Sequence, residues 1–503
     1  MTRRLAPAMA LAVGLCAATA SAAGPSSAHY ARGTDGMFWF LHVSDSHIGT
    51  DPIQGPHASE HLQFALQDAV DAIDPAFVVN TGDLTDGSRM HVPALGQDQA
   101  QWDEYKQICG AAGMDSSFYF DPPGNHDGYD DIGLTFYLAN SIQGQANGVP
   151  YSSWVVDTPV GQYYFFGFDT AGNGSQSFVE APDFTNEEIL ALDAGLQQHA
   201  GAELSFALGH HRLDEPANNA EAIGLLTGAD VGFYLHGHTH AYSEYLSGGG
   251  SIVSNEVNSL GKGDTDNIAV GVVDHNAFIY RAKDVTAPWP FVIITAPVSQ
   301  QLRGGSEDNP YVYTVCRDRT DNPVRAAVFA PTLPSDVQAE IIGGPTTAMY
   351  LVEGSSSIWY ALVDTTSVSA GQHSIIVTAT AGSDTAQDII QATFVDGPCD
   401  ALPGQDPPPN VGGAGGSGAG GAGGNGAQGG NGATGAGASG ATGGSGGSAG
   451  HTPPGPGAAS DATDEGGCGC RLATNRSSLP ASLLWLGLGA GVAVGRRRPR
   501  LRP

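Results

Sequence analysis

The chain is poor in basic residues. Its 503 residues include 20 Lys and Arg but 51 Asp and Glu, which gives a formal net charge of −31 at pH 7. A protein that binds nucleic acid needs Lys and Arg to neutralise the phosphates, so this balance argues against nucleic acid as a structural partner. It does not exclude an anionic substrate, because bound metal ions can reverse the local charge.

Cysteine is also scarce, with six residues in the whole chain. Three of them lie in the terminal segments, which leaves Cys109, Cys316 and Cys399. Cys316 and Cys399 bracket much of the later part of the chain, and we expect them to form a disulfide. We expect Cys109 to be a buried free thiol.

The N-terminus has the order of a secretory signal peptide. Arg3 and Arg4 precede an apolar run over residues 5–20, and the small residues "ASA" follow at 20–22. A charged segment, an apolar segment and a small-residue cleavage site predict a signal peptide over residues 1–22. The rest of the chain is therefore expected to be exported.

The C-terminus combines "GCGC", the apolar residues 479–495 and an Arg cluster. As a helix, residues 479–495 would extend roughly 26 Å, close to the hydrocarbon thickness of a bilayer, with the Arg cluster in the cytoplasm. This order resembles a MYXO-CTERM bacterial sorting tag over residues 468–503. The resemblance implies a processing protease and membrane attachment at the cell surface or outer membrane, whereas the alternative is a plain single-span anchor.

Residues 401–467 contain long glycine-rich stretches such as "GGAGGSGAGGAGG". This composition cannot form a packed core. We interpret the segment as a flexible linker between the globular sequence and the C-terminal tag.

Strand and helix patterns alternate over residues 29–285. The apolar runs "MFWFLHVS" (37–44) and "AFVVNTG" (76–82) predict buried strands. The apolar spacing of residues 59–73 predicts a helix with Ser59 at its N-cap. Repeated alternation of this kind is typical of an α/β layered fold.

Residues 286–400 show short alternating strands separated by turns, and no helix pattern. This predicts a second, smaller all-β domain of the Ig-like sandwich type.

Polar residues follow five of the predicted strands. They are Asp45 and His47, then Asp83, then Asn125 and His126, then His210, and finally His238 and His240. In an open α/β sheet, ligands bind outside the carboxyl ends of the strands, so we expect these side chains to meet.

The five blocks read D-x-H, G-D, G-N-H-D, G-H and G-H-x-H, and the resemblance they carry covers residues 37–282. In this order they resemble the calcineurin-like metallophosphoesterases. The resemblance implies a four-layer β-sandwich flanked by helices and two divalent metal ions, Mn, Fe or Zn, bridged by one carboxylate. It implies a first ion held by Asp45, His47, Asp83 and His240, and a second held by Asp83, Asn125, His210 and His238.

The stretch "PPGNHDG" at residues 122–128 also carries the candidate catalytic residues. The resemblance suggests His126 as the general acid for the leaving group, with a metal-bridging hydroxide as the nucleophile. Asp127 either orients this imidazole or caps the following turn. Asp86 stands where purple acid phosphatases carry a tyrosine, so the iron–tyrosinate branch is not expected.

Five further histidines fit none of the five blocks, and we expect them to be structural. They are His42, His61, His211, His236 and His275. His211 is the exception with an open alternative, because it could exchange roles with its neighbour His210.

The expected function is therefore hydrolysis of phosphate mono- or diesters by an exported, surface-attached enzyme. No residue distinguishes the two ester classes. The alternative is a non-catalytic binding or adhesion protein that uses the β-sandwich and keeps the phosphoesterase unit as a scaffold. The complete set of ligand residues argues against this alternative.

Overall fold

The computed structural model describes residues 34–87, 96–171, 182–263, 266–275, 277–304, 307–397 and 399. All of them fall within one unit of the chain, residues 1–417. The predicted signal peptide, the glycine-rich linker and the C-terminal tag with its apolar segment lie outside the described residues. No described helix has the length and the apolar character of a membrane span.

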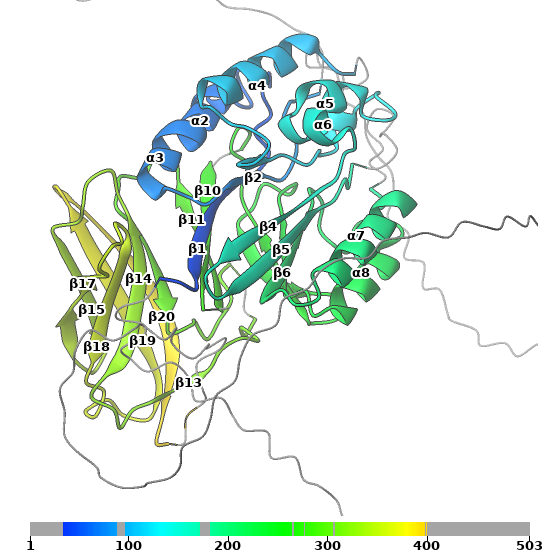
Figure 1. Ribbon diagram of the computed structural model, residues 1–503. Helices are drawn as coiled ribbons and strands as arrows, with labels where there is room; N and C mark the ends of the chain where they lie inside the picture. Colours follow the sequence, from blue (N-terminus) through cyan, green and yellow to red (C-terminus); the bar gives the residue numbers. More distant parts are fainter. Residues whose placement is uncertain are drawn as a thin grey trace, which may run out of the picture. The chain divides into compact units, whose positions relative to one another are not determined.

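Strands and helices alternate between residues 37 and 284, and the strands form two sheets (Figure 1). The first sheet has the spatial order β11 (Ala277–Asp284), β10 (Asn267–Asp274), β1 (Met37–Val43), β2 (Val78–Asn80) and β3 (Tyr119–Phe120). The second sheet has the order β4 (Ser152–Thr158), β5 (Gly161–Gly167), β6 (Leu204–Leu208), β7 (Phe233–His236), β9 (Ile252–Glu256) and β8 (Ser243–Ser247). Strands β1 to β3 are parallel, and so are β5, β6, β7 and β9, with antiparallel strands beside them. These mixed sheets confirm the predicted α/β class.

Aromatic side chains fill the space between the two sheets. Phe40 of β1 stacks on Phe77, with ring centroids 4.9 Å apart, and on Phe278 at 5.9 Å. It meets Phe165 and Phe206 of the second sheet edge-on, at 5.7 and 6.3 Å. Burial of each such side chain contributes about 1.5–3 kcal/mol, so this layer holds the two sheets firmly against each other.

Helices pack against the outer faces of both sheets. The first sheet is covered by α2 (Ala58–Phe64), the π-helical turn η1 (Ala65–Ala69), α3 (Val70–Ile73), α4 (Gln99–Ala111), α5 (Thr135–Asn140) and α6 (Ile142–Asn147). The second is covered by α7 (Asn186–Gln198) and α8 (Asn219–Gly228). Strand β1 shows why: Leu41 and Val43 face the helices, while Phe38 and Phe40 face the second sheet. Because side chains alternate along a strand, a strand between two layers must be apolar on both faces.

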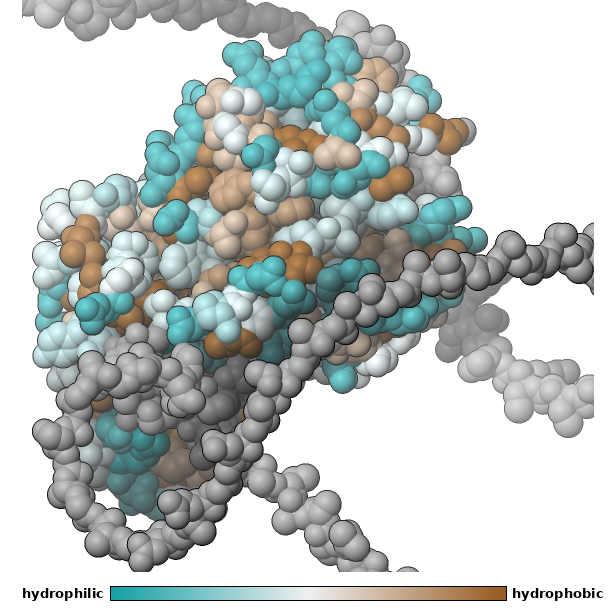
Figure 2. Space-filling view, in the orientation of Figure 1, coloured by the Kyte–Doolittle hydropathy of each residue, from teal (hydrophilic) through white to brown (hydrophobic). Residues whose placement is uncertain are grey.

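The helix predicted over residues 59–73 is present but differs in two details. It begins at Ala58, with His57 rather than Ser59 at the N-cap, because the Ser59 hydroxyl donates instead to Glu104 at 2.6 Å. The middle of the helix widens into the π-helical turn η1. The neighbouring α4 turns Trp102 and Tyr105 into the core, and hydrophilic residues gather over its outer surface (Figure 2).

The described residues after β11 contain strands but no helix. A third sheet has the order β12 (Phe291–Ala296), β14 (Asn322–Phe329), β18 (Ile358–Val363) and β17 (Tyr350–Leu351). A fourth has the order β13 (Thr314–Cys316), β20 (Asp384–Val395), β19 (Gly371–Ala381), β15 (Asp336–Ile341) and β16 (Thr346–Ala348). The two sheets share an apolar core that includes Val328 and Val377. An immunoglobulin-like topology for this region stays a prediction.

The cysteine predictions hold in the structure. Cys316 and Cys399 form a disulfide, with their Cα atoms 5.1 Å apart. Cys109 is a buried free cysteine in α4.

The strands after β11 also pack against the first sheet. Trp39 of β1 lies 5.6 Å from Phe329 of β14, measured between ring centroids. A buried ion pair joins Asp274 of β10 to Arg325 of β14 at 3.1 Å. The later strands therefore cover apolar surface of the α/β region and share its core.

Candidate active site

The carboxyl ends of five strands deliver the predicted site residues to one place. Asp45 and His47 follow β1, Asp83 follows β2, Asn125 and His126 follow β3, His210 follows β6, and His238 and His240 follow β7. Among the seven predicted metal ligands, all but Asn125 are linked to one another by side-chain contacts of 3.2–3.7 Å. Asn125 adjoins this group through His126, whose side chain is 3.8 Å from Asp83.

Each of the two carboxylates has one oxygen fixed by a backbone amide. His238 N donates to Asp45 Oδ2 at 3.1 Å, and His126 N donates to Asp83 Oδ1 at 2.8 Å. The other oxygens face imidazoles: Asp45 Oδ1 lies 3.2 Å from His240 Nε2, and Asp83 Oδ2 lies 3.3 Å from His210 Nε2. Asp45 Oδ1 is buried and accepts no hydrogen bond from the described part of the chain.

The imidazoles of the candidate ligands point their nitrogens at one another. His47 Nε2 and His240 Nε2 are 3.2 Å apart, and so are His210 Nε2 and His238 Nδ1. The Nδ1 atom of His210 contacts the carbonyl oxygen of Thr81 at 2.9 Å. A carbonyl only accepts, so this contact places a proton on Nδ1 and leaves the Nε2 lone pair for the site. Two nitrogens that face each other so closely need a proton or a cation between them.

The backbone at these positions is strained. Five of the predicted ligands have positive φ angles: Asp45 (54°), His47 (44°), Asp83 (52°), His238 (75°) and His240 (56°). Residues other than glycine rarely adopt this region, and each instance costs on the order of 1–3 kcal/mol. Such strain concentrates at functional sites, where the surrounding structure holds it in place.

Two glycines allow the ligand loops to approach each other. A Cβ atom at Gly124 would collide with Asp83 Oδ1, and a Cβ atom at Gly237 would collide with Asp45 Oδ2. Any larger residue at these positions would therefore displace one of the two carboxylates.

The charges of the site call for cations. Burial alone would raise the pKa of the Asp83 carboxyl, but His210 and His126 hold this pKa well below its usual range. Burial likewise opposes the charged form of His210, yet Asp83 and Asp45 outweigh it and raise the pKa of the imidazole to about 10. The two buried carboxylates thus attract positive charge, here as a proton. Divalent metal ions supply the same charge, and mixed carboxylate and imidazole ligands suit them. The donor set therefore fits metal ions.

His126 is oriented by a backbone carbonyl. Its Nδ1 lies 2.6 Å from the carbonyl oxygen of Asp86, which leaves Nε2 directed toward Asp83 Oδ2 at 3.8 Å. Burial lowers the pKa of His126 to about 4, although Asp83 opposes this shift.

Asp127 differs from both predicted roles. Its carboxylate accepts hydrogen bonds from the backbone amides of Leu84, Thr85 and Gly124, at 3.0, 3.1 and 2.9 Å. The His126 ring is held by the Asp86 carbonyl instead. Asp127 thus ties the loop after β2 to the loop after β3, beside the positions of Asp83 and Asn125.

Two further residues contact the candidate ligands, and the sequence patterns assigned neither of them a role in the site. Tyr129 Oη accepts a hydrogen bond from Asn125 Nδ2 at 3.0 Å, which orients the amide. Asp86 Oδ1 lies 3.8 Å from His47 Nδ1 and 3.2 Å from Lys262 Nζ. An outer carboxylate of this kind typically orients a metal-binding imidazole. In the sequence, the position of Asp86 three residues after Asp83 was the only indication that it lies near the site.

Four of the histidines expected to be structural have partners away from the ligand cluster. His42 contacts Tyr280 and Thr81, His61 pairs with Asp266, His236 contacts Tyr245, and His275 pairs with Asp274. The fifth, His211, lies beside His210 and His238, with ring centroids 5.0 and 4.4 Å away.

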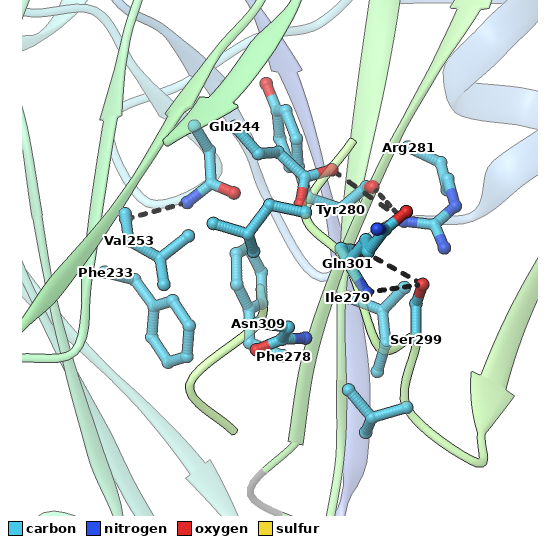
Figure 3. Close-up of a pocket in the computed structure, with 13 residues that line it drawn as sticks. Phe233, Glu244, Val253, Phe278, Ile279, Tyr280, Arg281, Ser299, Gln301 and Asn309 are labelled. Carbon is cyan, nitrogen blue, oxygen red and sulfur yellow. Dashed lines mark hydrogen bonds and ion pairs between the residues drawn. The ribbon is translucent and has the colours of Figure 1, made fainter. Parts of the chain in front are cut away.

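A separate small pocket lies between the second sheet, β11 and the chain around residue 300 (Figure 3). Its lining includes Phe233, Glu244, Val253, Phe278, Arg281 and Gln301. Its volume of about 20 Å³ suits a single water molecule and is too small for a phosphate ester. None of the predicted ligands lines this pocket, so it is distinct from the candidate site.

The chain contains a calcineurin-like phosphoesterase domain. Residues 38–242 match the family described as calcineurin-like phosphoesterase. This segment carries all five ligand-bearing strand ends, in agreement with the sequence resemblance.

The curated relatives are distant. The chain is 25% identical over 339 residues to the Arabidopsis thaliana protein At3g03305, which is named as a metallophosphoesterase; the match covers 61% of this chain and 43% of that protein. It is 27% identical over 296 residues to mouse (Mus musculus) transmembrane protein 62, and this match covers 55% of this chain and 44% of that protein. The chain thus spans less than half the length of these relatives, and both matches are longer than the segment 38–242.

Among solved structures, a phosphatase from Mycoplasma pneumoniae shares 13% identity with the chain. The TM-score between the two structures is 0.31, and the match covers 49% of this chain and 93% of that chain. The assignment of the domain rests on the family match and on the geometry of the site.

Proposed function

We propose that this protein is a dinuclear metal-dependent phosphoesterase that hydrolyses phosphate mono- or diesters. The first ion would be held by Asp45, His47, Asp83 and His240, and the second by Asp83, Asn125, His210 and His238. One observation carries the proposal: two pairs of imidazole nitrogens face each other at 3.2 Å, beside two buried carboxylates. Mn, Fe or Zn suits these ligands.

Divalent ions bound there would neutralise phosphoryl charge and provide a nucleophilic hydroxide near neutral pH. The protein supplies the remaining functions. Asp83 lies 3.7 Å from His47 and 3.3 Å from His210, so it would contribute to both proposed metal sites. His126 presents Nε2 to the same space and would donate a proton from this atom to the leaving-group oxygen. An anionic ester beside the ring favours its protonated form, against the effect of burial.

The chain is further proposed to act outside the cytoplasm, attached to a membrane through its C-terminal segment. This proposal depends on the signal-like N-terminus, on the Cys-Gly-Cys, apolar and Arg-rich order of residues 468–503, and on the disulfide between Cys316 and Cys399. The adhesion alternative has weaker support, because the later strands share a core with the α/β region.

A screen of the purified protein with chromogenic phosphate mono- and diesters, under added Mn²⁺, Zn²⁺ or Fe²⁺, tests the proposed activity. We expect nitrophenol release that chelation abolishes and metal restores, and the preferred ester identifies the substrate class. The Asp83→Asn variant is the control for contaminating phosphatases, because it keeps the size of the side chain but weakens the shared ligand. Equal rates in wild type and variant, or no release under any metal, contradict the proposal.

A further inference from the structure

The hydroxyl of Thr170 makes three contacts, all of them buried. Thr170 follows β5, and its Oγ1 accepts hydrogen bonds from the backbone amides of His210 at 3.1 Å and His211 at 3.0 Å. The third contact joins the same oxygen to the ring nitrogen Nδ1 of His211, at 3.0 Å.

The capacity of a hydroxyl decides where the protons lie. A threonine hydroxyl has two lone pairs and one proton. The two backbone amides occupy both lone pairs, so the hydroxyl proton must point to His211 Nδ1. If His211 Nδ1 carried a proton, it would be a third donor to Thr170 Oγ1, which has no lone pair left to accept it. His211 Nδ1 is therefore an acceptor, and the neutral ring carries its proton on Nε2.

His210 and His211 are consequently opposite tautomers. The Nδ1 atom of His210 donates to the carbonyl oxygen of Thr81, which leaves the Nε2 lone pair for a metal ion. The Nε2 atom of His211 bears a proton and has no lone pair to offer in the ring plane. His211 therefore cannot exchange roles with His210 as a ligand.

The Nε2–H group of His211 is buried, on a ring that lies beside His210 and His238, and it has no acceptor among the described residues. Only 1% of the residue is exposed, and no described residue accepts a hydrogen bond from Nε2. Ring nitrogens of His210, His211 and His238 all lie within 4.8 Å of one another. Buried donors are nearly always satisfied, so this group is expected to meet an acceptor when the site is in use. In the proposed function, His210 and His238 would hold the second ion, so their lone pairs would not be available as acceptors.

We propose that the Nε2–H group of His211 donates a hydrogen bond to a phosphoryl oxygen of the substrate, on the side of the second ion. This inference rests on the proposed phosphoesterase function. Thr170 acts as a positioning residue, since its hydroxyl fixes the tautomer of the donor. The phosphoryl group is the acceptor of suitable chemistry, because it is anionic and must lie against the ions.

Phosphate binding to the metal-loaded full-length protein tests this assignment. The probe is inorganic phosphate, with its Kd measured by calorimetry, together with the metal content of each variant. His211→Leu removes the donor and should weaken phosphate binding about 10- to 100-fold, the range expected for a hydrogen bond to a charged group. His211→Gln places an amide donor near Nε2 and should recover part of the loss. Both variants should keep the metal content of the wild type.

Thr170 provides a matched pair of variants. Thr170→Ser keeps the hydroxyl and should bind phosphate like the wild type, whereas Thr170→Val removes it and should weaken binding. The wild type also permits a test without any substitution, since nitrogen-15 NMR of histidine-labelled, Zn-loaded protein reports which ring nitrogen carries the proton. We expect a protonated Nε2 and an unprotonated Nδ1 for His211.

Three results overturn the inference. A His211→Leu variant that loses metal would make His211 a ligand, and one that binds phosphate like the wild type would make it structural. An NMR signal showing a proton on His211 Nδ1 would remove its basis, even if every variant failed to fold. If the wild type binds no phosphate at all, the proposed function fails as well. If the wild type binds phosphate but the His211 and Thr170 variants bind it equally well, only this inference fails and the proposed function stands.

Discussion

The strand ends of the α/β region and the sandwich of later strands differ in backbone strain and in the kind of residues they bury. Ten described non-glycine residues have positive φ angles, and five of them are predicted metal ligands. All ten precede residue 276, and none lies in the described residues of the later strands. There, strands such as β15 alternate buried and exposed residues regularly, and the inner side chains are almost all aliphatic or aromatic.

This difference separates the residues that carry the chemistry from those that provide stability. The site concentrates strained backbone, close glycines and buried charge, each of which lowers the stability of the fold. The apolar layers around it, including the shared core with β14, contribute the compensating free energy. Substitutions in the two regions should therefore affect different measurements.

The largest effect is expected for Asp83→Asn. Substitution of outer partners of metal ligands typically costs 10- to 100-fold in activity, so loss of the shared ligand should cost at least about 10³-fold. The free energy of unfolding without metal should fall as well, because Asp83 and His210 form a buried pair at 3.3 Å and removal of one partner leaves the other uncompensated. Turnover, metal content and chemical unfolding of the purified variant provide the three measurements. A variant that keeps both metal and activity would remove Asp83 from the site.

His126→Ala should lower turnover about 10²–10⁴-fold on alkyl or nucleoside esters. The loss should be much smaller on nitrophenyl esters, because nitrophenolate leaves readily without a proton. Metal content should match the wild type. Equal losses on both substrate classes, with metal retained and chemistry rate-limiting, would show that His126 is not the general acid.

Asp274→Asn should affect stability rather than chemistry. Asp274 is 2% exposed and faces the fully buried Arg325, and loss of one partner of a buried pair typically costs about 3–5 kcal/mol. Burial opposes the charged carboxylate, but Arg325 outweighs it and holds the pKa of Asp274 well below its usual range. The pair therefore stabilises the fold above the ordinary aspartate pKa of about 3.9 and loses this effect as the pH falls below it.

Chemical unfolding of wild type and Asp274→Asn at several pH values measures this contribution. The difference in the free energy of unfolding between wild type and variant should be largest near neutral pH and should shrink in acid. Turnover of the folded variant should stay within about threefold of the wild type. Thr286→Ala serves as a control on an exposed turn, where changes usually stay within about 0.5 kcal/mol. A difference that does not change with pH would assign the stability to packing rather than to the ion pair.

The smallest effect is expected from a cut after Asp400. The glycine-rich segment that follows cannot form a core, so turnover and unfolding should stay unchanged within error. In cells, the shortened protein should leave the surface fraction and enter the medium. Loss of folding after this cut would show that the C-terminal segment is structural.

The sequence allowed prediction of the features that repeat locally. Apolar runs that end in D-x-H, G-D, G-N-H-D, G-H and G-H-x-H predicted the strands and the cluster of candidate ligands at their ends, because parallel strands end at the same edge. The cysteine pair was also predictable, since two cysteines frame the later strands. These predictions depended on residues close together in the chain or on one ordered pattern.

The features that escaped prediction depend on contacts between distant residues. Asp127 binds amides more than 40 positions away in the loop after β2, so its role could not be distinguished from a local cap. The tautomer of His211 is set by Thr170, and no pattern links the two. Packing of Trp39 on Phe329 joins β1 to β14, which lie far apart in the sequence, and no local pattern identifies this contact.

The metal content of the protein tests the central claim most directly. Elemental analysis of protein purified without chelator, then reloaded with Mn²⁺ or Zn²⁺, should give about two ions per chain, as the shared-carboxylate arrangement requires. Asp83→Ala should disturb both sites, whereas His47→Ala should weaken mainly the first. A wild-type protein that holds no metal and takes up none, or an Asp83→Ala variant that still holds two ions, would contradict a dinuclear site built on Asp83.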